Sequence, residues 1–151
     1  MDSITRDAEI LSAEIRKVFA ELEQNGFIFQ AATIQNTRAS GDYVEALIPN
    51  QTTGRSLRFA YFPGLIHPEG LSIHIENGTG GGAVSVDEFL EYKNTNSQLI
   101  EKIILANYKG TLEKRFNGLL NAAKEVMYQH LENYLFGGEW VSIPMQWGDL
   151  K

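Results

Sequence analysis

The chain has no cysteine among its 151 residues. Disulfide bonds, thiolate metal sites and cysteine nucleophiles are therefore excluded. The chain also has no apolar run close to the roughly 20 residues that a membrane-spanning helix needs. Its first residues lack a basic segment followed by an apolar one, so they do not form a secretory signal. We expect a cytoplasmic protein that does not associate with membranes.

Basic residues are scarce: Lys and Arg number 13 against 19 Asp and Glu, which gives a net charge of −6. The densest basic cluster is Lys114-Arg115. Binding to nucleic acid depends on clustered cations that neutralise phosphates. We therefore expect no nucleic-acid partner. A basic protein partner stays open, because an acidic surface can steer one toward it.

Motifs for metal, cofactor and nucleophile chemistry are missing as well. The three histidines, His67, His74 and His130, fall in a predicted loop, strand and helix and lack the paired spacing of metal ligands. No Gly-x-Ser-x-Gly or Ser-x-x-Lys sequence is present. The sequence therefore predicts no metal and no cofactor.

The composition that remains is that of a single globular domain over residues 1–151, with 43% hydrophobic and 21% charged residues. Residues 3–25 are predicted to form an amphipathic helix that ends at Asn25-Gly26. Its apolar positions recur every three or four residues, at Ile4, Ala8, Leu11, Ile15, Val18 and Leu22.

Extended runs rich in aromatic and branched residues follow the helix. The gaps between them are short and hold turn-forming residues, which favours antiparallel pairing because a parallel crossover needs about a dozen residues or more. We therefore predict a four-stranded antiparallel meander. Its strands cover residues 27–34, 43–48, 56–62 and 71–76.

Alternation along the third and fourth runs separates two faces of this sheet. The apolar face holds Leu57, Phe59 and Tyr61, then Leu71, Ile73 and Ile75. The other face is mixed and carries Arg58, His74 and Glu76. The first two runs are apolar on both faces, so we expect them to be covered on both sides or to lie at an interface.

The second half of the chain is predicted to be helical. The β half ends near residue 77, residues 78–82 form a glycine-rich joint, and Ser85-Val86-Asp87-Glu88 matches the Ser-x-x-Glu capping box. Helices are predicted from 85 to about 93, from 95 to 110 and over 112–136, followed by an aromatic tail at 139–151. The predicted fold is α+β, with the C-terminal helices packed on one face of the sheet.

The first candidate site lies on the mixed face. His74 and Glu76 are two residues apart on one strand and point the same way. A histidine oriented by a carboxylate can act as a general base, and Arg58 on the neighbouring strand could hold an anion. The alternative, which we favour, is an exposed salt-bridge ladder.

The second candidate site is the glycine segment, where Gly80, Gly81 and Gly82 could present backbone N–H groups to an anion. Asp87 and Glu88 would repel a phosphate there. A connector that binds no ligand is the favoured interpretation.

The third candidate is the C-terminal tail, where Trp140, Ile143, Met145 and Trp147 could bind a partner. Aromatic residues and methionine are enriched in interface cores. The favoured interpretation is that the tail folds back onto the domain.

Three functions follow. We expect first a small acidic, non-enzymatic binding protein that neutralises, escorts or regulates a protein partner, as immunity proteins, antitoxins, inhibitors and secretion chaperones do. The alternative is a small-ligand-binding protein or modest hydrolase that uses Arg58, His74 and Glu76, gated by the Gly78–Gly82 loop. A structural homodimer is the third.

Overall fold

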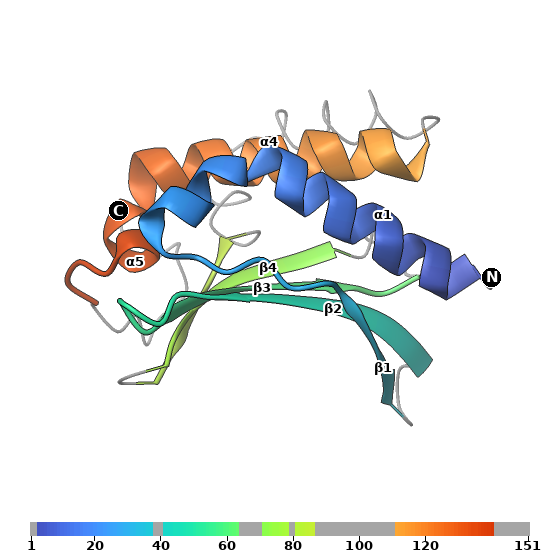
Figure 1. Ribbon diagram of the computed structural model, residues 1–151, viewed down its shortest axis with the longest axis horizontal. Helices are drawn as coiled ribbons and strands as arrows, with labels where there is room; N and C mark the ends of the chain where they lie inside the picture. The colour runs from blue at the N-terminus through green and yellow to red at the C-terminus, as the bar shows by residue number, and fades with distance from the viewer. Residues whose placement is uncertain (1–2, 38–40, 64–70, 79–80, 87–110, 141–151) are drawn as a thin grey trace, which may run out of the picture.

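The computed structural model describes residues 3–37, 41–63, 71–78, 81–86 and 111–140. The fold is α+β, as predicted, with helices on one side of an antiparallel sheet (Figure 1). The helical elements are α1 (Ser3–Val18), the 3-10 helix η1 (Ala20–Asn25), α4 (Leu112–His130) and α5 (Glu132–Phe136). The strands are β1 (Thr33–Thr37), β2 (Gly41–Pro49), β3 (Arg55–Tyr61), β4 (Leu71–Asn77) and β5 (Ala83–Ser85).

The sheet is a meander in which each strand pairs with the next along the chain, in the order β1-β2-β3-β4-β5. All four pairings are antiparallel, and the register places Ile48 opposite Leu57 and Leu57 opposite Ile75. The predicted meander is thus correct in topology but has five strands rather than four. The fifth strand was missed because it contains only three residues.

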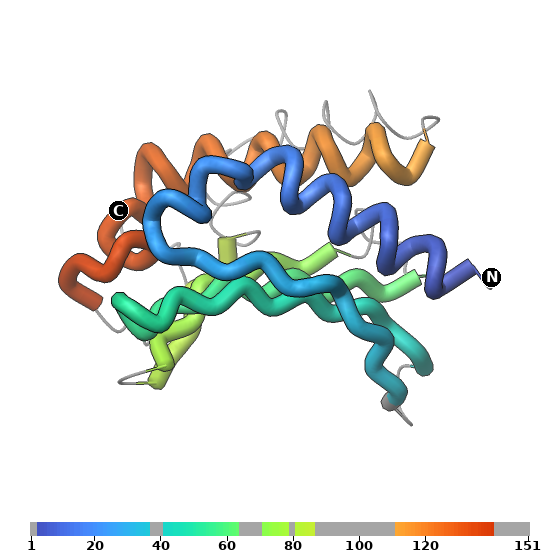
Figure 2. The backbone as a smooth tube through the Cα atoms, viewed as in Figure 1, coloured from blue at the N-terminus to red at the C-terminus, as the bar shows by residue number. Residues whose placement is uncertain are grey.

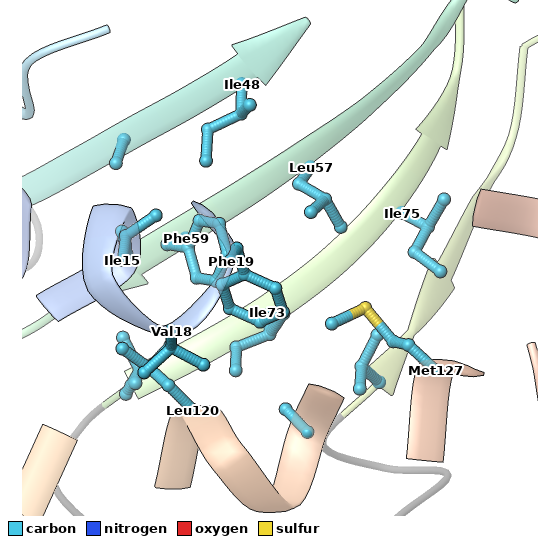
Figure 3. Packing of buried hydrophobic residues seen from close by; sticks show 14 of the residues in the cluster. Ile15, Val18, Phe19, Ile48, Leu57, Phe59, Ile73, Ile75, Leu120 and Met127 are labelled. Atoms are coloured by element: carbon cyan, nitrogen blue, oxygen red, sulfur yellow. The ribbon is translucent and has the colours of Figure 1, made fainter. Parts of the chain in front are cut away.

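The predicted division of the sheet into two faces is also confirmed. Along β3 and β4 every second residue is buried, and the buried set begins with Arg55 on β3 and Leu71 on β4. The buried residues of β2, β3 and β4 pack against α1 and α4, which lie side by side over that face (Figures 1 and 3). Phe19 packs on Phe59 at a ring separation of 5.8 Å near the centre of this core. Full burial of one such side chain stabilises the fold by about 1.5–3 kcal/mol.

The predicted helix over residues 3–25 is divided at Phe19 into α1 and η1, but two helical elements do end where the sequence provides a stop. Gly26 follows η1 with a φ of 93°, and Gly137 follows α5 with a φ of 87°, a left-handed conformation that favours glycine. The side chain of Thr111 caps α4 by accepting a hydrogen bond from the Lys114 N–H at 3.3 Å. None of the described helices is both long enough and apolar enough to cross a lipid bilayer.

The predicted single helix over 112–136 is wrong in one respect, because it is interrupted at Leu131. This residue has a φ of −118° and separates α4 from α5. Leu131 and Leu135 are both fully buried. The apolar stripe continues across the interruption, so periodicity alone could not reveal it.

The predicted first strand over 27–34 is shifted in the structure to β1 at Thr33–Thr37. Phe27 forms only an isolated bridge with Asn50. The Ala32 N–H bonds to the Ser12 hydroxyl of α1 at 2.8 Å. The segment before β1 is therefore held partly by the helix and partly by the end of β2.

The sequence predicted that the glycine segment is the boundary between a β half and a helical half, and this prediction is wrong. The segment joins β4 to β5, with the Asn77 N–H bonded to the Gly82 carbonyl at 3.0 Å and the Gly81 N–H bonded to the Asn77 carbonyl at 2.8 Å. The sheet consequently continues through Ser85 instead of ending near residue 77. The helices predicted up to residue 110 and the tail beyond Trp140 lie outside the described residues.

Candidate functional site

The face of the sheet that points away from α1 and α4 is not covered by any described helix or strand (Figure 2). We call it the open face. Residues directly opposite one another in an antiparallel pair share a face, so the register defines its members. They are Thr33 and Gln35 on β1; Tyr43, Glu45, Leu47 and Pro49 on β2; Ser56, Arg58 and Ala60 on β3; Ser72, His74 and Glu76 on β4; and Ala83 and Ser85 on β5.

Arg58 lies at the centre of an ionic network on this face. Its Nη1 donates to Glu45 Oε2 at 2.8 Å and its Nε donates to Glu76 Oε2 at 3.0 Å. The guanidinium is therefore held between carboxylates from β2 and β4. Burial lowers the pKa of Arg58, but the hydrogen bonds and charges of Glu76 and Glu45 outweigh that effect and raise the pKa above its ordinary value.

His74 lies directly opposite Arg58 on β4, and its polar neighbour is Ser72. The Ser72 Oγ and the His74 Nδ1 are 3.3 Å apart, and the tautomer decides which of them donates. Glu76 is hydrogen-bonded to Arg58. The three predicted residues therefore do share one face, where Arg58 and Glu76 form an ion pair, whereas His74 contacts Ser72 instead of being oriented by Glu76. Glu45 completes the ladder and was not predicted.

An aromatic pair lies beside the network on the open face. Tyr43 and Phe62 stack with ring centroids 4.7 Å apart and an angle of 21° between the rings. Both side chains are partly exposed, as is Leu47 opposite Arg58. The open face thus combines apolar surface with an ordered set of charges.

The predicted ligand loop is explained by the turn between β4 and β5. Gly81 and Gly82 have φ values of 76° and 98°, so the turn itself requires glycine there. A Cβ at Gly82 would also lie 3.2 Å from the Trp140 Nε1. Gly80 lies outside the described residues. The two described glycines therefore serve the turn and the close approach of the indole.

Trp140 is the one described residue of the predicted tail site, and it packs on the domain. Its ring lies 4.9 Å from the guanidinium of Arg55 and 4.9 Å, edge to face, from the ring of Tyr134. This agrees with the tail folding back, at least as far as Trp140. Ile143, Met145 and Trp147 lie outside the described residues.

Arg55 is a buried cation that sequence reasoning missed. It is 6% exposed and lies on the helix-facing side of β3. Its Nη1 donates to the carbonyls of Asn133 at 3.0 Å and Tyr134 at 2.7 Å, and its Nη2 donates to the carbonyl of Gly138 at 2.6 Å. Burial lowers the pKa of Arg55. The alternation along β3 could have revealed it, because Arg55 lies two residues before the buried Leu57 and therefore points to the same face of the strand.

Two further polar features lie between the helices. Lys124 and Tyr128 of α4 both bond to the carboxylate of Glu21 in η1, at 2.5 and 3.0 Å, and so fasten α4 to η1. A polar groove of about 280 Å³ separates α1 from α4. It is lined by Glu14, Lys17, Glu113, Lys114, Asn117 and Gly118. Within the described ranges, no three His, Asp or Glu side chains are grouped to hold a metal ion.

Comparison of the chain with protein-family models, with curated proteins and with solved structures gave no match. Function is therefore inferred from the open face and its surroundings.

Proposed function

We propose that the protein is a non-enzymatic binding protein and that its partner, another protein, docks on the open face. The observation that carries the proposal is the pairing of an ordered Glu45–Arg58–Glu76 network with partly exposed apolar side chains, Tyr43, Leu47 and Phe62, on a face that no described element covers. Tyrosine and arginine are among the residues most enriched at protein interfaces.

The rigidity of the open face favours binding. Arg58 is fixed by two carboxylates, and the rings of Tyr43 and Phe62 are fixed against each other. Side chains that are ordered before a partner arrives lose less conformational entropy when it binds. A partner could therefore bind this surface without much reorganisation.

Charge indicates the chemistry of the partner. The chain has a net charge of −6, and the open face carries Glu45 and Glu76 against the single Arg58. Oppositely charged surfaces are steered together and exclude wrong partners. We infer a partner with basic side chains around an apolar centre, for which the protein would act as an immunity protein, antitoxin, inhibitor or secretion chaperone.

Co-purification from the native host, or from cells that express the neighbouring genes, tests the proposal. We expect the wild type to retain a protein that Leu47→Asp loses at least about tenfold, because the new carboxylate would be stripped of water at the centre of the interface and the adjacent Arg58 already pairs with two carboxylates. The matched control is Lys17→Ala, an exposed position on α1, which should retain the partner. Failure to recover any partner, or equal recovery by all three proteins, would refute the proposal. Circular dichroism verifies that each variant is folded.

A small-ligand-binding or hydrolytic role for the same face is the second candidate, and the contact between Ser72 and His74 favours it. In this alternative His74 would act as the base. His74→Ala should then abolish turnover or ligand binding. Unchanged turnover in that variant would eliminate the alternative.

A further inference from the structure

We propose that two copies of the chain pair antiparallel through the outer edge of β1, so that their sheets join into one continuous sheet. The inference does not rest on the proposed function. In the sheet order β1 is a terminal strand, and within the described residues only β2 pairs with it. A terminal strand presents unpaired backbone N–H and C=O groups to any strand that approaches it.

The segment from Phe27 to Thr37, whose last five residues form β1, lacks the residue types that block edge pairing. Its eleven residues contain no charged residue, no proline and no glycine. At the 21% charged content of the whole chain, eleven residues would carry about two charges (0.21 × 11). Proteins usually protect an edge strand with charged side chains, proline or a bulge. The uncharged edge therefore suits a contact rather than open water.

Exposed apolar side chains point to the same segment. Among the described residues, the large hydrophobic side chains that are clearly exposed are Ile28, at 46%, and Ile34, at 42%. Ile34 lies opposite Val44, whose side chain is buried on the helix-facing side. Ile28 follows Phe27, which is buried in the core, so Ile28 points to the open-face side. A strand added along β1 would cover Ile34.

Charge favours a second copy over a different partner. An antiparallel contact around a two-fold axis places β1 opposite itself, and an uncharged strand then meets no like charge. Each copy carries −6, so two copies repel each other on average, and a contact through an uncharged strand keeps charged side chains out of the interface itself. A basic partner, in contrast, finds no carboxylate along residues 27–37. In the joined sheet the two open faces would lie next to each other.

Sedimentation equilibrium of the full chain tests the proposal, over roughly 1–100 µM protein, a range suited to weak dimers. The monomer mass is 16.9 kDa, so a dimer has twice that mass, 33.8 kDa. We expect the wild type to approach the dimer mass and Ile34→Lys to weaken dimerisation at least about tenfold. The matched control is Ala20→Lys, which adds the same charge at an exposed position of η1 and should dimerise like the wild type.

A second measurement uses the absence of cysteine. Single cysteines placed along β1, at Thr33, Ile34, Gln35 and Asn36, should form a disulfide-linked dimer at the position nearest the two-fold axis, whereas Ala20→Cys should not. A wild type that is monomeric over the whole range, or a dimer that forms no cross-link along β1, overturns the inference. Because neither measurement uses the protein partner, they can fail while partner capture succeeds, and the reverse.

Discussion

Arg55 offers the sharpest test of how this fold is held together. Its guanidinium donates to three carbonyl groups of the segment that ends α5 and stacks on Trp140. Each hydrogen bond contributes about 1 kcal/mol net, and the stacking adds about 1 kcal/mol. We therefore expect Arg55→Ala to lower the free energy of unfolding by about 3–4 kcal/mol, since three carbonyls would lose their donor and the stacking on Trp140 would be lost.

Guanidinium chloride denaturation measures this change, and tryptophan fluorescence is a suitable probe because Trp140 contacts the mutated side chain. Arg55→Lys should recover part of the loss, since an ammonium group can reach one or two of the carbonyls but lacks the planar fork. Arg58→Ala is the matched control on the same strand. Its ion pairs are partly exposed, so it should lose less than about 1 kcal/mol.

The reasoning would be refuted if Arg55→Ala and Arg58→Ala destabilised the protein equally, because burial and the number of carbonyl acceptors would then not determine the loss. A loss below about 1 kcal/mol for Arg55→Ala would show that the cost of burying the guanidinium cancels its hydrogen bonds.

Two further predictions concern a glycine and the response to alkaline pH. Gly137→Ala should destabilise the protein by more than about 2 kcal/mol in the same denaturation assay, because its φ is 87° and a Cβ would lie 2.7 Å from Thr53 Cγ2. Gly41→Ala, with a similar φ of 77° but no atom within 4 Å, should lose only about 1 kcal/mol from strain, and equal losses would contradict the steric argument. Burial, and then the hydrogen bond to Glu21, raises the pKa of Tyr128 in the folded protein. The neutral Tyr128 phenol therefore contributes its full share of the free energy of unfolding below the ordinary tyrosine pKa of 10.0, and this contribution declines as the pH rises above that value. The stability advantage of the wild type over Tyr128→Phe should therefore shrink as the pH rises above about 10, and an advantage that stays constant would disprove the linkage.

Much of the fold could be predicted from the spacing of apolar residues and from the positions of turn-forming residues. The alternation from Leu57 to Tyr61 identified the buried face of β3, and Asn25-Gly26 and Gly137 marked the helix ends. The prediction failed where tertiary contacts override local pattern. The segment before β1 reads as a strand, but the Ala32 N–H bonds to Ser12 of α1.

The candidate site was predicted in composition but not in pairing. Parity alone placed Arg58, His74 and Glu76 on one face. Which carboxylate binds Arg58 depends on the register between β2, β3 and β4, which short strands and variable turns do not determine in advance. Glu45 was missed for that reason. Arg55 was missed because its acceptors are backbone carbonyls 78 or more residues away in sequence.

The two helices that cover the sheet come from opposite ends of the described chain, α1 from Ser3–Val18 and α4 from Leu112–His130. During synthesis the strands and α1 emerge long before α4, so the nascent sheet keeps part of its apolar face without its final cover. Exposed apolar strands are prone to aggregate while they wait for late contacts. A ribosome-stalled or truncated chain that ends at residue 110 would lack α4 entirely. Such a product should be recovered in the insoluble fraction, because the apolar face of its sheet would lack the cover that α4 provides.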